Sequence, residues 1–89
     1  MKKIIHPKTD YLELLLESPD GLTANEISEI YFDDVDPSTA RKALTRLFKQ
    51  GCAMREKEGR EYRYWITDKG ILRYDYLLKR VEEETKSAI

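Results

Sequence analysis

The chain has 89 residues and a formal net charge of −1; 40% of the residues are apolar and 37% are charged. This length suits one compact domain, and the composition excludes both a disordered tail and a membrane-spanning protein. The single Cys and single His exclude an internal disulfide and a structural zinc site. We therefore expect one domain over residues 1–89, with no metal or other cofactor. We expect it in the cytoplasm, because its first residues lack the apolar stretch of a signal peptide.

The first predicted element is a helix that begins at Asp10. Asp10 can cap this helix together with Glu13, and a Leu-rich apolar face follows. The helix should end at residues 18–21, Ser-Pro-Asp-Gly, which are a dense turn signal. His6, in the polar segment before the helix, indicates no specific role.

The second predicted helix begins with a capping box made by Thr23 and Glu26, and runs through Tyr31. Ile27, Ile30 and Tyr31 are spaced as one face of a helix, so we expect them to pack on the first and third helices. Residues 32–35 are predicted to form the turn that follows.

The third predicted helix spans residues 37–50. Asp36 followed by Pro37 is typical of a helix start, and Gly51 of the position just after a helix end. Its apolar residues recur at helical spacing and predict one buried stripe. The members of that stripe are Ala40, Ala43, Leu44, Leu47 and Phe48.

Charge is distributed unevenly along the chain. Residues 1–36 carry a net charge of −6, residues 37–63 a net charge of +5, and residues 64–89 are balanced. No acidic residue occurs between Pro37 and Arg55. A local basic surface is what the neutralisation of DNA phosphates requires, although an exposed basic helix face can also be merely solvated.

Two strand-like runs follow, from Cys52 to Lys57 and from Tyr62 to Ile66, and they predict a hairpin over residues 52–66 with a charged, Gly-containing tip. The alternation of the second run places Tyr64 on the face that packs on the third helix. Trp65 then lies on the opposite face, where we expect it to cover the last helix. Cys52 is interpreted as a small packing residue.

The last predicted helix spans residues 68–86 and is capped by Thr67. Four apolar residues of this helix recur at spacings of 3, 4 and 3, which is the pattern of a coiled-coil seam. We therefore predict a symmetric homodimer packed through this helix, with ordinary core packing as the alternative. The residues of the seam are Ile71, Tyr74, Leu78 and Val81.

The order of three helices, a hairpin and a fourth helix resembles the winged helix-turn-helix regulators that bind DNA. Its most specific parts are residues 47–51, Leu-Phe-Lys-Gln-Gly, and residues 64–70, Tyr-Trp-Ile-Thr-Asp-Lys-Gly. They resemble the Leu-x-x-x-Gly and aromatic-x-Leu-Thr-x-x-Gly segments of regulators similar to the MarR and PadR groups. The resemblance implies an α+β, mostly α fold with a three-helix bundle, a two-stranded wing and a long C-terminal helix. The resemblance implies a DNA-binding core over residues 10–67, and the coiled-coil spacing predicts that the helix over residues 68–86 forms the dimer.

The resemblance implies a function as a sequence-specific transcriptional regulator of double-stranded DNA. The third helix would enter the major groove, and the wing would contact the DNA backbone or the minor groove. The helix residues predicted to contact DNA are Ser38, Thr39, Arg41, Lys42, Thr45, Arg46 and Lys49, and those of the wing are Lys57, Arg60 and Arg63.

Two other classes of function compete with this one. A winged helix can instead bind another protein in a transcription or replication assembly, and the acidic overall balance is compatible with that alternative. An enzyme is not expected, because the sequence offers no pair of nucleophile and base and no Gly-rich phosphate loop. Nothing in the sequence indicates a small-molecule ligand.

Overall fold

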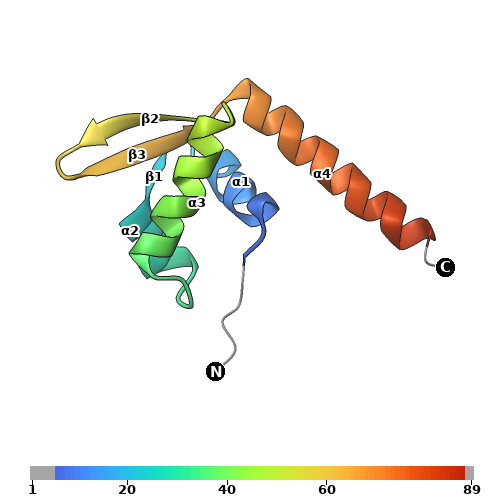
Figure 1. The fold of residues 1–89 in the computed structure, drawn as a ribbon, viewed down its shortest axis with the longest axis horizontal. Coiled ribbons are helices and arrows are strands. Elements are labelled where there is room, and N and C mark those ends of the chain that lie inside the picture. Colours follow the sequence, from blue (N-terminus) through green and yellow to red (C-terminus); the bar gives the residue numbers. More distant parts are fainter. Residues whose placement is uncertain (1–5, 88–89) are drawn as a thin grey trace.

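The computed structural model describes the backbone of residues 6–87 and the side chains of residues 6–80. Its elements are α1 (Lys8–Leu16), β1 (Leu22–Thr23), α2 (Ala24–Glu26), η1 (Ile27–Tyr31), α3 (Pro37–Lys49), β2 (Ala53–Glu58), β3 (Glu61–Ile66) and α4 (Asp68–Ser87). The β2–β3 hairpin extends to one side of the helices and α4 to the other (Figure 1). The mostly α, winged helix-turn-helix fold class predicted from the sequence is thereby confirmed.

The core lies between α1, α3 and the base of the hairpin. Its most deeply buried large side chains are Leu12 and Leu15 of α1, Ile27 of η1, Leu44 of α3 and Tyr64 of β3. Helices too short to be stable alone are stabilised by packing their apolar faces together in this way. Because the hairpin supplies Tyr64 to the same core, the position of the wing is coupled to that of the helices.

The sheet has three antiparallel strands in the order β1-β3-β2. Strand β1 was not predicted from the sequence, since it is only two residues long and forms part of a helix cap. It pairs Thr23 with Arg63 and Leu22 with Tyr64, which makes β3 the central strand. In the hairpin, Glu58 pairs with Glu61 across the two-residue tip.

Helix α1 begins earlier than predicted. Pro7 occupies the N-cap position, and Asp10 lies in the first turn of the helix instead of capping it. The Asp10 carboxylate accepts a hydrogen bond from His6 Nδ1 at 3.1 Å. The prediction of an Asp10 cap was wrong because a residue outside the helix uses that carboxylate.

The second helix has the predicted start but not the predicted buried face. Both hydrogen bonds of the capping box between Thr23 and Glu26 are present, which confirms that part of the prediction. Beyond it the backbone widens into a π-helical turn, in which the Phe32 amide donates to the Ile27 carbonyl at 2.8 Å. Ile27 is buried, whereas Ile30 and Tyr31 are 65% and 47% exposed. The expected shared face was wrong, since the spacing rule assumes 3.6 residues per turn and a π turn contains more.

Helix α3 has the predicted termini. Asp36 Oδ1 accepts a hydrogen bond from the Thr39 amide at 2.7 Å, and Gly51 closes the helix with a φ of +77°. Ala40, Leu44 and Leu47 are buried as predicted, and Ala43 is half-buried. Phe48 is 38% exposed, so its assignment to the buried stripe was wrong. The Arg55 guanidinium covers its ring instead.

The junction between the hairpin and α4 depends on Thr67 and Gly70. Thr67 Oγ1 accepts a hydrogen bond from the Gly70 amide at 3.1 Å, which confirms the predicted cap. The same hydroxyl donates to the Gly51 carbonyl at 2.6 Å, so it also connects α4 to the end of α3. Tyr74 and Leu77 of α4 pack against the core.

Trp65 does not cover α4 as expected. It lies against the turn after α1, where a Cβ added to Gly21 would be 2.8 Å from the indole ring. The expectation was wrong because β1 pairs with β3 and thereby brings the turn at Gly21 close to the Trp65 ring. Cys52 is buried, as its interpretation as a packing residue requires.

Candidate nucleic-acid interface

One side of α3 is a continuous cationic surface. Its four basic residues are all exposed, because the apolar residues of the helix occupy the side that packs on the core. We refer to this surface as the basic face; it consists of Arg41, Lys42, Arg46 and Lys49. The helix contains no acidic residue that would offset these charges.

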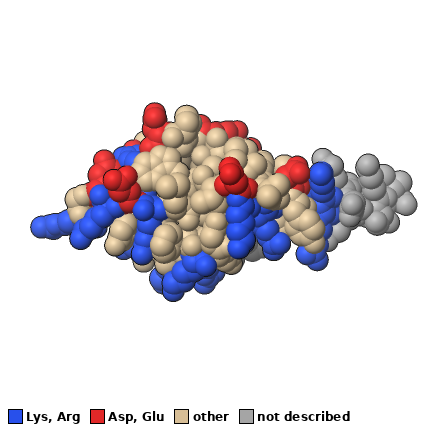
Figure 2. Space-filling view, turned by 90° about the horizontal axis from the view of Figure 1, so that it is seen from above, with Lys and Arg blue, Asp and Glu red and all other residues tan. Residues whose placement is uncertain are grey.

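The cations of the basic face have no anionic partner in the part of the chain that the structure describes, where each recorded ion pair involves other residues. Lys and Arg side chains gather along one edge of the molecule, and most Asp and Glu side chains lie toward the opposite edge (Figure 2). The small net charge therefore conceals a strong separation of charge. Such a surface attracts a polyanion at long range while the opposite surface repels it.

Residues with hydroxyl side chains lie in the first turn of α3 and among the cations of the basic face. Ser38 and Thr39, in the first turn of α3, are exposed. Thr45 is half-buried, and its Oγ1 donates a hydrogen bond to the Arg41 carbonyl at 2.8 Å. Because that bond fixes the rotamer of Thr45, its methyl group has a defined direction on the helix.

The tip of the hairpin presents two further cations. Lys57 and Arg60 are exposed, and the tip consists of Gly59 and Arg60. Gly59 has a φ of +64°, and a Cβ placed there would meet nothing within 4 Å. Glycine adopts this conformation at no steric cost, which allows the tight turn that places Arg60 at the tip.

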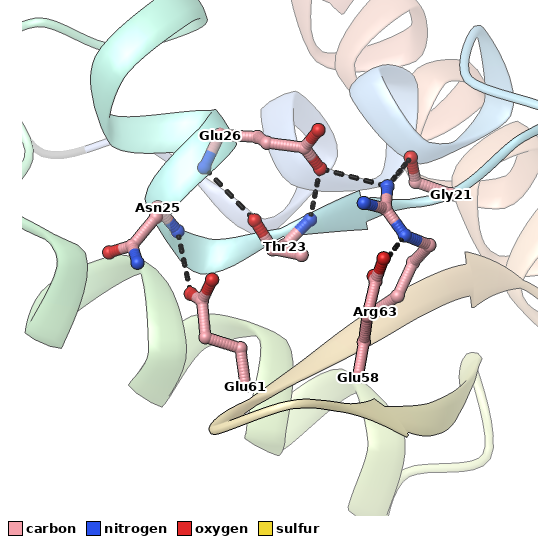
Figure 3. Close-up of polar contacts among 7 residues, drawn as sticks. All are labelled: Gly21, Thr23, Asn25, Glu26, Glu58, Glu61 and Arg63. Atoms are coloured by element: carbon pink, nitrogen blue, oxygen red, sulfur yellow. Dashed lines mark hydrogen bonds and ion pairs between the residues drawn. The ribbon is translucent and has the colours of Figure 1, made fainter.

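Arg63 differs from the other predicted wing contacts because its guanidinium is engaged inside the protein (Figure 3). Its Nε donates to Glu58 Oε2 at 2.6 Å, and its Nη1 donates to Glu26 Oε1 at 2.9 Å and to the Gly21 carbonyl at 3.1 Å. The sequence-based prediction that Arg63 contacts DNA therefore conflicts with the arrangement of this side chain. The structure does not bring it together with Lys57 and Arg60.

Glu26 takes part in both the helix cap and the contact with Arg63. Burial raises the pKa of Glu26, but the Thr23 amide and the charge of Arg63 lower it by more, so the pKa lies below its usual value. The carboxylate is therefore ionised at neutral pH and accepts charge-assisted hydrogen bonds. From the sequence, Glu26 was predicted only as a capping residue, because its contact with Arg63 joins positions far apart in the chain.

Arg55 is a further residue whose role the sequence did not reveal. Its guanidinium carbon lies 4.1 Å from the ring centroid of Phe48 and 4.1 Å from that of Tyr62. These cation–π contacts join β2 and β3 to the end of α3. The alternating aromatic residues of β3 indicated only that they share a face of the strand. They could not show that Arg55 also contacts Phe48 of α3.

The predicted dimerisation residues of α4 are in different environments. Ile71 and Leu78 are 39% and 40% exposed, whereas Tyr74 is half-buried and packs against the core. Val81 belongs to α4, and its side chain lies outside the described residues. An exposed apolar strip thus borders the side of α4 that packs on α1.

The described residues contain no cluster of three His, Cys, Asp or Glu side chains that could bind a metal ion. None of the helices, as far as the structure describes them, is long and apolar enough to cross a membrane.

The fold of this chain is similar to those of several solved structures. The transcriptional regulator SlyA shares 27% identity at a TM-score of 0.67, over 93% of this chain and 58% of SlyA. The PcaV transcriptional regulator from Streptomyces coelicolor, solved in complex with its natural ligand, shares 22% identity at a TM-score of 0.74, over 97% of this chain and 61% of PcaV. A MarR protein from Peptoclostridium difficile shares 28% identity at a TM-score of 0.67, over 91% of this chain and 51% of that protein. No protein-family model and no curated protein sequence matches the chain.

The chain spans between about half and three fifths of the length of these three proteins. The similarity covers nearly all of this chain. The helices and strands are also arranged in space as they are in these three proteins. The order of predicted elements along the chain does not specify that arrangement.

Proposed function

We propose that this chain, which has the winged-helix fold of MarR-like transcriptional regulators, binds double-stranded DNA through α3 and the β2–β3 hairpin and thereby regulates transcription. The observation that carries the proposal is the basic face. Four exposed cations lie on one helix that contains no acidic residue, and within the described residues none of them is paired. Such cations neutralise DNA phosphates and release condensed counterions, which favours binding.

The dimensions of α3 suit the major groove, which admits one α-helix. Arg41 and Lys42 lie in the N-terminal half of the helix, the part that meets base edges in this fold, and can donate to guanine. The fixed methyl group of Thr45 can contact a thymine methyl group. The remaining α3 residues of the proposed interface contact phosphates; they are Ser38, Thr39, Arg46 and Lys49.

The hairpin adds a second contact beside the groove. Arg60, at the exposed tip, is proposed to enter the minor groove, where Arg is favoured by the negative potential of narrow A·T segments. Lys57 is proposed to contact a phosphate. Arg63 is not included in this interface, because its guanidinium already donates three hydrogen bonds to protein acceptors.

The proposed regulator is a homodimer packed through α4. The exposed Ile71 and Leu78 support this part, since they lie on one strip of a helix that extends away from the core (Figure 1). A symmetric dimer presents two copies of α3 to half-sites about 10 base pairs apart or a multiple of that distance. The operator is therefore expected to be nearly palindromic.

The test is the binding of a fluorescently labelled random duplex, measured by anisotropy at several salt concentrations. The wild type should bind with an affinity that falls steeply with salt, and an Arg41→Glu/Lys42→Glu variant should lose at least about a hundredfold in affinity. The matched control is Arg73→Glu/Lys79→Glu, which changes the net charge equally at two exposed positions of α4. Light scattering on each variant verifies that its mass is that of the wild type.

Two outcomes contradict the proposal. If the control variant loses as much affinity as Arg41→Glu/Lys42→Glu, binding depends on net charge and not on the basic face. If the wild type does not bind duplex DNA even at low salt, the alternative function gains support, in which the same face binds a protein partner of a transcription or replication assembly.

A further inference from the structure

A group of charged side chains joins the wing to the helix-turn-helix. We call it the wing clasp, and it consists of Arg63, Glu26, Glu58 and the carbonyl of Gly21 (Figure 3). Arg63 belongs to the central strand, Glu58 to the end of β2 beside the tip, and Glu26 to the first turn of the second helix. One guanidinium therefore joins the hairpin to residues 21–26, which are distant from it in sequence.

The geometry of the clasp requires arginine. The guanidinium donates from Nε to Glu58 on one side and from Nη1 to Glu26 and Gly21 on the other, with donor–acceptor distances of 2.6, 2.9 and 3.1 Å. A planar group with fixed donor directions can span two carboxylates, whereas a lysine ammonium is a point charge on a flexible stem. The contacts of Arg63 therefore fix the direction of the hairpin as well as attaching it to the second helix.

The pairing of the hairpin separates its charges onto two faces. Glu56 pairs with Arg63 and Glu58 with Glu61, so these four residues lie on the same face as the clasp. Glu61 Oε1 also accepts a hydrogen bond from the Asn25 amide at 3.4 Å, which directs a second wing carboxylate toward the second helix. Lys57 lies on the opposite face, which Arg55 joins to Phe48 of α3.

We propose that Arg63 is a positioning residue that fixes the angle of the hairpin through the wing clasp, so that Lys57 and Arg60 face the same DNA as the basic face. This inference rests on the proposed function and names how the wing is oriented for it. The clasp also binds the Glu58 carboxylate, which would otherwise lie beside the tip and repel phosphates.

The proposal makes an unusual prediction for Glu26. Removing the charge of the Glu26 carboxylate makes the protein more positive, so long-range electrostatics alone predicts tighter binding to DNA. If the clasp orients the wing, the same change weakens binding because Lys57 and Arg60 lose their fixed position. The two explanations therefore differ in the sign of the effect.

The test compares Glu26→Gln with Glu29→Gln in the full chain. Gln keeps an oxygen that can accept the Thr23 amide, so the helix start is retained, while the negative charge that pairs with Arg63 is removed and the clasp is weakened. Glu29 is the matched control, because it is exposed and the described residues offer it no hydrogen bond or ion pair. Affinity for duplex DNA and its dependence on salt are measured for the wild type and for both variants.

Glu26→Gln should lower the affinity by about two- to fivefold, the effect of a partly exposed charge pair. The slope of log affinity against log salt should become shallower by about 1, because the phosphate contact of Lys57 is lost. Glu29→Gln should bind as well as the wild type or better. Equal or tighter binding by Glu26→Gln, with an unchanged slope, overturns the proposal.

A measurement without DNA separates this inference from the proposed function. Backbone 15N relaxation reports the order of the Gly59 and Arg60 amides, which should fall in Glu26→Gln and in Arg63→Lys but not in Glu29→Gln. If the wild type fails to bind DNA while these amides respond as expected, the proposed function fails and the clasp stands. If the amides keep their order in both clasp variants, the clasp is overturned, whatever the binding result.

Discussion

The imidazole of His6 stacks on the ring of Phe32, with the ring centroids 3.8 Å apart and the planes inclined by 2°. The two ring nitrogens of His6 also contact carboxylates, Nδ1 that of Asp10 at 3.1 Å and Nε2 that of Asp34 at 2.9 Å. His6 thus joins the segment before α1 to the turn before α3. The expectation that it has no specific role was wrong, because two of its three partners, Phe32 and Asp34, lie in a turn that only the fold brings close to it.

The stability of the protein should depend on the protonation of His6. Both ring nitrogens face acceptors, so the imidazolium is the form that satisfies both contacts. The hydrogen bond to Asp34 raises the pKa of His6, burial opposes this, and Asp10 raises it further, so the pKa lies above its ordinary value. Asp34, whose pKa His6 lowers, remains ionised near neutrality.

The sign of this dependence follows from the raised pKa. A group that binds its proton more tightly when folded stabilises the protein fully below its unfolded pKa, and that contribution disappears as the pH rises through the folded value. The urea midpoint should therefore decrease between about pH 6 and pH 8. A His6→Gln variant should show little change over the same range, and an equal decrease in this variant would assign the effect to other groups.

Gly70 should not tolerate a side chain. A Cβ at this position would lie 2.1 Å from the Cys52 carbonyl oxygen and 2.7 Å from Ile66 Cγ1. The carbonyl cannot easily withdraw, since it accepts the Thr67 amide at 3.1 Å. Gly70→Ala should therefore lower the free energy of unfolding by about 3 kcal/mol, measured by urea denaturation.

The matched control for that variant is Gly59→Ala. Position 59 has open space for a Cβ but a φ of +64°, so the cost is backbone strain of only about 1 to 2 kcal/mol. Equal losses at the two positions would contradict the close contact between α4 and Cys52.

The π-helical turn can be tested with two isoleucines of one helix. Ile27→Ala removes a fully buried side chain and should lower the free energy of unfolding by about 2 to 4 kcal/mol. Ile30→Ala changes a side chain that is 65% exposed and should cost less than about 0.5 kcal/mol. If both variants were destabilised equally, the regular helix predicted from the sequence would be correct and the π turn would not.

Local signals in the sequence were sufficient for α3, for the capped start of the second helix and for the basic face. The Asp36 cap, the Thr23 capping box and the end of α3 at Gly51 were predicted because each depends on neighbouring residues. The exposed cations followed from helical periodicity in the same way. The resemblance to MarR-like winged-helix regulators is confirmed by the fold, which is shared with solved structures of such regulators.

Contacts between distant residues were not predictable by the same reasoning. Arg63 looked like any other cation of the wing, because Glu26 and Gly21 approach it only after β1 has paired with β3. Arg55 and His6 gained their partners for the same reason. The π turn also escaped prediction, since the residues of η1 fit a regular helix equally well and packing decides between the two.

The proposed dimer can be tested at Leu78. This side chain is 40% exposed, and it lies seven residues after Ile71, hence on the same side of α4. Leu78→Asp should prevent association, because a charge in an apolar interface loses its hydration without gaining a partner. Light scattering at tens of micromolar should give the mass of a dimer for the wild type and of a monomer for this variant.

Leu72→Asp is the control for association through a specific strip of α4. Leu72 is 70% exposed, more than Leu78, yet it lies about a third of a turn away around the helix. If burial of any exposed apolar residue drove association, Leu72→Asp would dissociate the dimer at least as strongly. If the strip that contains Ile71 and Leu78 is the interface, Leu72→Asp remains a dimer and should bind a palindromic site as the wild type does. Leu78→Asp should then bind the same site more weakly, because its two copies of α3 are no longer linked. A monomer mass for the wild type would leave α4 without this role and would limit the protein to single half-sites.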